Sequence, residues 1–351
     1  MSTLGKVAKF GGAGLALLVL AGGGFYVNAG MKNEAYMAKT YEAHTQEIPV
    51  PFPLNNAEMS ALRAERTPPV DPAAPPVDPN APAVDVLEGV DVVAIATERG
   101  AARGKHLVEA RFACIECHGD NFGGGTMIDD PAIGKVLGPN LTMGKGSKSL
   151  SYTSADWERK VRHGINPGGS SGPMPSGDFV KMSDQELSDI ITYIRTLPPI
   201  DNEVAALSLG PVGRILMATG QIKNAADEIG TQATEHTLVP PASDQASLEL
   251  GNHVLNVCSG CHHADFAGGP VPGGPPDWLP SSNLTPHEDG LKGWTRDDLA
   301  KVLREGIRKD GTPVGVPMTL MTKYGNNMTE VEIDSLWMAL AALPPVPDPK
   351  Q

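Results

Sequence analysis

Two pairs of cysteine residues, each followed at once by a histidine, carry the clearest chemistry in this sequence. The first pair lies in residues 114–118, and the second lies 144 residues further along, in residues 258–262. The chain holds only four cysteines and nine histidines, so chance alone does not readily explain a histidine directly after both pairs. Two thiols one helical turn apart, beside an imidazole, can attach or bind a cofactor. The six residues are Cys114, Cys117, His118, Cys258, Cys261 and His262.

Several other kinds of site use cysteine pairs, but each explains this pattern less well. A thioredoxin-like redox pair needs a βαβ context, and a zinc ribbon needs its pairs about 15–20 residues apart. Structural disulfides are possible in an exported protein but leave both histidines unexplained. C-x-x-C-H is the attachment signature of c-type haem, with two thioether links and iron ligation by the histidine Nε2. The sequence therefore predicts two covalent haem c groups, with His118 and His262 as iron ligands.

Methionines at equal spacing are candidates for the sixth iron ligand. Met174 lies 60 residues after Cys114, and Met318 lies 60 residues after Cys258. A thioether ligand raises the reduction potential of the iron and closes it to small molecules. Equal spacing favours this pair, although Met321 remains a rival to Met318. The other methionines, which compete for this position or fill core space, are Met127, Met143 and Met182 in the first copy and Met321 and Met328 in the second.

The two motifs belong to a long internal repeat of helical character. In each copy a capping box, Ser183-x-x-Glu186 or Thr329-x-x-Glu332, begins an amphipathic pattern that ends at Leu-Pro-Pro. No strand-like alternation of useful length appears, so we predict an all-α fold. Further matches between the copies are Asn140-Leu141-Thr142 with Asn283-Leu284-Thr285, Gly164-Ile165 with Gly306-Ile307, and Leu197-Pro198-Pro199 with Leu343-Pro344-Pro345.

The N-terminal region predicts export of the rest of the chain. Lys6 and Lys9 precede an uncharged run over residues 10–27, which is long enough for a transmembrane helix with a cytoplasmic N-terminus. A cleaved signal peptide ending near Ala29 is the alternative. The net charge of −13 and the pI of about 5.1 argue against a nucleic-acid partner.

These patterns divide the chain into seven segments. The expected segments are a transmembrane signal-anchor (1–29), a stalk (30–66), a Pro-rich linker (67–97), the first repeat as a domain (98–200), an interdomain segment (201–245), the second repeat as a domain (246–346) and a tail (347–351).

Both repeats resemble class I cytochrome c domains, and the pair resembles the tandem cytochrome c subunits of bacterial membrane-bound dehydrogenase and oxidase systems. The matching elements are the Gly-x-His helix, C-x-x-C-H, Pro139-Asn140-Leu141-Thr142, Gly172-Pro173-Met174-Pro175 and the helix ending in Leu-Pro-Pro. The resemblance implies three to four helices around each haem. It also implies that the Pro139 carbonyl accepts the Nδ1–H of His118, with Ser282 in that place in the second copy. The second copy departs in having Thr319 after its methionine.

The expected function is single-electron transfer rather than catalysis. Partners would be a membrane dehydrogenase, a quinol-oxidising complex or a terminal oxidase, with the chain held by one anchor at the periplasmic side of a bacterial inner membrane. The alternative is a dihaem cytochrome c peroxidase or MauG-like oxidase. Such an enzyme needs one iron that can open to peroxide, and a methionine at the same spacing in both copies argues against it.

Overall fold

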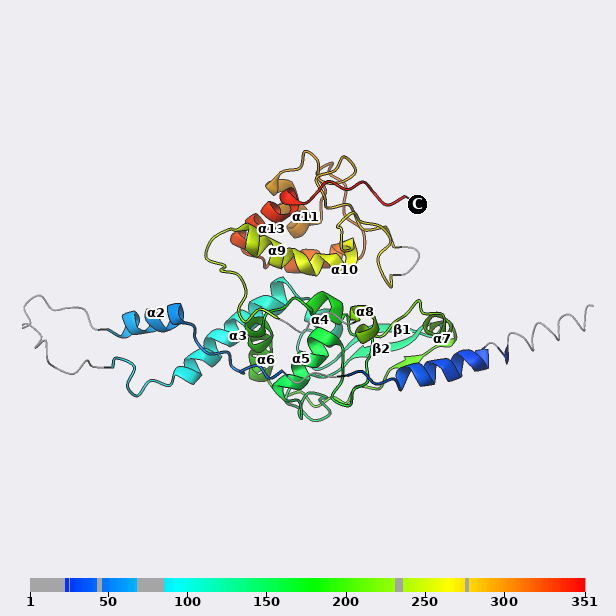
Figure 1. Ribbon diagram of the computed structural model, residues 1–351, viewed down its shortest axis with the longest axis horizontal. Coiled ribbons are helices and arrows are strands. Elements are labelled where there is room, and N and C mark those ends of the chain that lie inside the picture. The colour runs from blue at the N-terminus through cyan, green and yellow to red at the C-terminus, as the bar shows by residue number, and fades with distance from the viewer. Residues whose placement is uncertain are drawn as a thin grey trace, which may run out of the picture.

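The computed structural model describes residues 23–24, 26–42, 46–67, 85–230, 236–274 and 278–350, and Figure 1 shows two helical lobes. The first lobe comprises residues 85–230, and the second comprises residues 246–346 apart from 275–277. Most of the predicted Pro-rich linker, residues 68–84, lies outside the described residues.

The first lobe is built on two long helices that pack against each other, α3 and α6. Helix α6 begins at the predicted capping box, where Ser183 Oγ accepts from Glu186 N, and its apolar residues are fully buried. Ile48, from the predicted stalk, is also buried in the core of this lobe. The helices before the second lobe are α2 (Asn56–Arg66), α3 (Val92–Ala110), α4 (Cys114–His118), α5 (Ser154–His163), η1 (Ser176–Phe179), α6 (Asp184–Thr196), α7 (Pro211–Ala218) and α8 (Ala225–Ile229).

The second lobe repeats this plan around a separate core. Helix α13 starts at the capping box of Thr329 and Glu332, and it packs along α9 as α6 packs along α3. Its helices are α9 (Leu248–Leu255), η2 (Asn256–Cys258), α10 (Ser259–His262), α11 (Arg296–Glu305), α12 (Met318–Gly325) and α13 (Glu330–Ala342).

A glycine allows the main helix pair of each lobe to cross closely. A Cβ atom on Gly104 of α3 would lie 2.0 Å from the carbonyl oxygen of Asp189. In the second lobe a Cβ on Gly251 would lie 1.9 Å from the carbonyl oxygen of Ser335. Both glycines belong to the Gly-x-His segments, so the repeated glycine has a packing cause in each copy.

The all-α prediction is wrong in the first lobe, which contains a small antiparallel sheet of order β1-β2-β3. The strands are β1 (Gly125–Asp130), β2 (Gly134–Gly138) and β3 (Ser208–Leu209). In β1 four of six residues are exposed, and its register shifts between Thr126 and Ile128. A short strand with little burial shows no alternation of apolar and polar residues, so the sequence pattern could not reveal it.

The structure does not support the prediction of an N-terminal transmembrane helix. Across the ranges that the structure describes, no helix combines the length and apolar character needed to cross a membrane. Most of the apolar run over residues 10–27 lies outside the described residues. Residues 26–37 are helical, and Asn33 Nδ2 donates to Arg214 O at 2.8 Å, so this helix packs on the protein. The inner-membrane, periplasmic placement rests on the predicted helix and is withdrawn with it.

Candidate haem sites

The first cysteine pair lies on the short helix α4, where one helical turn separates the two thiols. Ala113, directly before the helix, adopts the left-handed conformation with φ 48°, and Gly119 ends it with φ 78°. These two turns make Cys114–His118 a separate short helix at the edge of the core of the first lobe. Cys114 packs against this core, and Cys258 packs against the core of the second lobe.

The imidazole of each motif donates to a backbone carbonyl. His118 Nδ1 lies 2.9 Å from the carbonyl oxygen of Pro139, and His262 Nδ1 lies 2.7 Å from that of Ser282. Because a carbonyl only accepts, Nδ1 carries the proton and Nε2 keeps its lone pair. Burial lowers the pKa of both histidines, which favours the neutral, metal-binding form. The contact that the resemblance implies at Pro139 is therefore present, with an equivalent contact in the second lobe.

The repeated Asn-Leu-Thr segment explains why these carbonyls are held in place. In the first lobe the buried Asn140 accepts from Thr142 N at 2.9 Å and donates to Ile200 O at 2.7 Å. In the second lobe Asn283 accepts from Thr285 N at 2.8 Å and donates to Val346 O at 2.8 Å. Each asparagine thereby fixes the loop whose preceding residue binds the histidine.

No disulfide joins any two of the four cysteines, all of which the structure describes. Burial raises the pKa of Cys114 and of Cys258 to about 12, so neither is a reactive thiolate. A pair of thiols one turn apart, beside an imidazole whose Nε2 keeps its lone pair, suits a covalently attached haem.

The methionine candidates differ in how the structure places them. Met174 is half-buried and packs against the same core as Cys114. Met318 is the first residue of α12 and Met321 lies on the same helix, and both are half-buried. The structure therefore brings Met174 and Cys114 to one core, but it does not separate Met318 from Met321.

The other methionines fit roles in packing or at the surface. Met182 and Met328 are buried directly before the two capping boxes, where they pack at the entry of α6 and α13. Met127 and Met143 are 46% and 47% exposed.

The lobe interface brings each attachment motif against the other lobe, a relationship that sequence reasoning missed. Tyr324 of the second lobe donates to Glu116, within the first motif, at 2.6 Å. Conversely, Asp178 of the first lobe lies against Gly260, within the second motif, where a Cβ would meet its Oδ1 at 2.2 Å. Tyr324 and Asp178 each lie five residues before the capping box of their lobe, so the two contacts are equivalent in the repeat.

Part of the first lobe is similar to a known protein family. Residues 101–198 match the cytochrome c family. A cytochrome c domain carries covalently attached haem c, so the match supports a haem at the first motif.

The chain is also similar to cytochrome c subunits of dehydrogenases. It is 25% identical over 269 residues to the cytochrome c subunit of a quinone alcohol dehydrogenase from Gluconacetobacter polyoxogenes, covering 67% of this chain and 54% of that protein. It is 26% identical over 277 residues to the gluconate 2-dehydrogenase cytochrome c subunit of Pantoea cypripedii, covering 69% and 59%. A fructose dehydrogenase cytochrome subunit from Gluconobacter japonicus is 29% identical over 132 residues, covering 33% and 27%. The matches to the first two relatives span little more than half of their lengths, and all three relatives are named as cytochrome subunits of dehydrogenases.

Proposed function

We propose that this chain is a dihaem c-type cytochrome that relays single electrons from a dehydrogenase partner to a respiratory acceptor and performs no dehydrogenation itself. The domains would be residues 98–200 and 246–346. The observation that carries the proposal is the equivalence of the two motifs. Both histidines donate Nδ1–H to a carbonyl, at 2.9 Å and 2.7 Å.

Each set of residues would hold one haem in the same way. Cys114 and Cys117 would form the thioether links of the first site, and Cys258 and Cys261 those of the second. Haem, when bound, supplies one-electron iron chemistry. The hydrogen bonds from Nδ1 to Pro139 and Ser282 orient the two imidazoles and keep Nε2 available for the iron. The distal ligands proposed are Met174 and Met318.

The lobe contacts support electron exchange between the two sites. Glu116 of the first motif is bonded to Tyr324, and Gly260 of the second motif lies against Asp178, so both attachment helices line the interface. A fixed interface holds two redox sites in constant geometry, which an extended linker alone cannot do.

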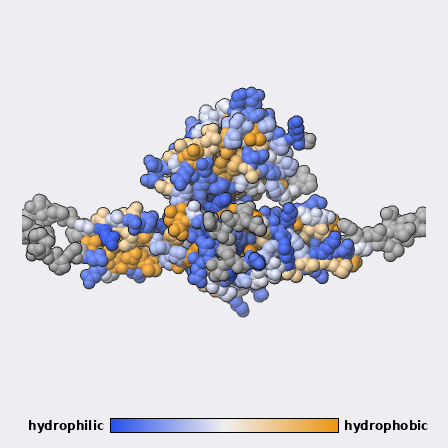
Figure 2. Space-filling model, in the orientation of Figure 1, coloured by the Kyte–Doolittle hydropathy of each residue, from blue (hydrophilic) through white to orange (hydrophobic). Residues whose placement is uncertain are grey.

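The negative net charge of the chain indicates what kind of partner surface it would dock against. The net charge is −13, and the face seen in Figure 2 is largely hydrophilic, with hydrophobic residues gathered over α2 and the start of α3. An acidic surface favours a partner that presents a basic patch around its own redox centre.

A coulometric titration of the purified holoprotein tests this function. We expect uptake of two electrons per chain in two one-electron steps, with no oxidation of alcohol, gluconate or fructose by the chain alone. Uptake of one electron per chain would contradict the dihaem proposal, and dehydrogenase turnover by the isolated chain would contradict the relay.

A further inference from the structure

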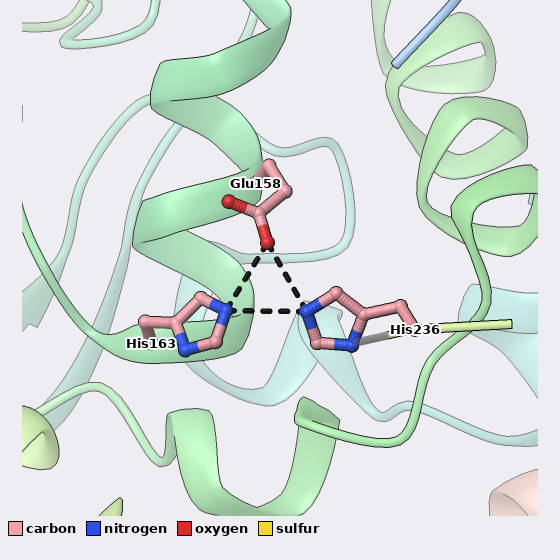
Figure 3. A group of neighbouring side chains, drawn as sticks. All are labelled: Glu158, His163 and His236. Carbon is pink, nitrogen blue, oxygen red and sulfur yellow. Dashed lines mark hydrogen bonds and ion pairs between the residues drawn. The ribbon is translucent and has the colours of Figure 1, made fainter. Parts of the chain in front are cut away.

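Outside both motifs, a carboxylate and two imidazoles converge where the segment before the second lobe meets the first lobe. Glu158 Oε1 lies 3.1 Å from His163 Nε2 and 3.3 Å from His236 Nε2, and the two Nε2 atoms lie 3.2 Å apart. Figure 3 shows one carboxylate oxygen and the two imidazole nitrogens directed at a common point. The side chains are 0%, 7% and 2% exposed, respectively.

The local structure explains why these residues meet. Glu158 and His163 lie on α5, which begins at the capping box of Thr153 and ends at Gly164 in the left-handed conformation. His236 is 73 residues beyond His163 and comes after α8. The backbone that follows it is pinned to the first turn of α6, because Asp184 N and Gln185 N donate to the carbonyls of residues 237 and 238, each at 3.0 Å.

The spacing of the three donor atoms matches a tetrahedral ion. With bonds of roughly 2.0–2.1 Å to nitrogen and oxygen, two ligand atoms of a tetrahedral zinc ion lie about 3.3 Å apart. The observed separations are 3.1, 3.2 and 3.3 Å. Two imidazole nitrogens that face each other can share one proton or can both bind a metal, and the metal uses both lone pairs.

A buried guanidinium lies beside this carboxylate. Arg162 Nη1 forms a buried ion pair with Glu158 Oε1 at 3.7 Å. The same atom is bonded to Asp184 Oδ1 at 2.7 Å, so Asp184 is the main partner of this guanidinium.

We propose that Glu158, His163 and His236 bind a zinc ion, which fastens the segment before the second lobe to α5. Two imidazoles and one carboxylate are donors that zinc prefers, whereas calcium and magnesium prefer oxygen ligands throughout. The ion would be redox-inert and separate from haem iron, and a water molecule would complete its four ligands. Because the residues lie outside both C-x-x-C-H motifs, this inference does not depend on the number of haems.

The test counts zinc in the purified holoprotein. The protein is incubated with excess zinc, passed through a desalting column and measured by inductively coupled plasma mass spectrometry, with haem iron counted in the same sample. We expect one zinc per chain in the wild type and less than about a tenth of that in His163→Ala and His236→Ala. His287→Ala is the matched control, because His287 also pairs with a carboxylate, Asp289, at 3.2 Å, but at the surface. It should retain one zinc.

A second measurement needs no variant. X-ray absorption at the zinc edge of the wild type should show a shell of nitrogen and oxygen neighbours near 2.0–2.1 Å, with the outer-shell signal of imidazole. A wild type that retains no zinc, or alanine variants that keep a full equivalent, would overturn the proposal. A first shell that contains sulfur would also overturn the proposal.

Discussion

His253 Nε2 of the second lobe lies 2.8 Å from Glu186 Oε1, in the capping box of α6 in the first lobe. The inverse pair is also present, because His106 Nε2 of the first lobe lies 3.0 Å from Glu332 Oε1 in the capping box of α13. The two histidines are equivalent in the repeat, and so are the two glutamates. Each lobe therefore extends its Gly-x-His imidazole into the helix cap of the other, and the lobes dock as two similar halves.

The charge of Glu186 makes this interface sensitive to acid. Burial alone would raise the pKa of Glu186, but the charge of Arg111 and the hydrogen bond from His253 outweigh it and lower the pKa to about 2. A carboxyl with a lowered folded-state pKa stabilises the protein above its unfolded value of about 4.5, and the contribution is lost as the pH falls towards 2. The shift corresponds to about 3 kcal/mol.

We therefore expect Glu186→Gln to lower the free energy of unfolding by about 3 kcal/mol at pH 7 and by much less near pH 2.5. Denaturant titrations across this pH range measure the difference. The matched control is Glu249→Gln, an exposed residue in the first turn of α9, which should change stability by less than about 0.5 kcal/mol. A Glu186→Gln effect of equal size at both pH values would show that the shape of this side chain, and not its charge, stabilises the protein.

The glycine crossings predict a steric effect in both lobes. Gly104→Ala and Gly251→Ala would place a methyl about 2 Å from a backbone oxygen, so the helices must separate. We expect each variant to lose about 2 kcal/mol or more in denaturant unfolding. Gly168→Ala, where nothing lies within 4 Å of the added atom, is the control and should be nearly neutral. Equal stability of all three variants would contradict the close crossings.

The methionine assignment predicts changes in reduction potential. Met174→His should lower the potential of one haem and Met318→His that of the other, each on the order of 100 mV or more, because imidazole favours oxidised iron more than a thioether does. Spectropotentiometric titration measures both potentials. Met321→His is the matched variant on α12 and should leave them unchanged. If Met321→His shifts a potential and Met318→His does not, the ligand of the second site is Met321.

Local patterns in the sequence predicted much of the site but not the contacts between lobes. The capping boxes at Ser183 and Thr329 mark the start of α6 and α13 because they satisfy backbone donors within one turn. The hairpin of β1 and β2 leaves little pattern, since most of β1 faces solvent.

The partners of His106 and His236 could not be predicted, because packing alone brings them together. His106 meets Glu332 across 226 residues, and His236 meets His163 across 73 residues. Sequence spacing carries information on ligands within one element, but it carries none on residues that meet only after the lobes have folded.

The haem-to-chain ratio tests the central claim most directly. The pyridine haemochrome of the denatured protein, divided by the polypeptide concentration, should be close to two. Replacing both Cys258 and Cys261 with Ala should lower the ratio to one and leave the spectrum of the first site intact. A wild-type ratio of one, or a ratio that the double replacement leaves unchanged, would contradict the dihaem account.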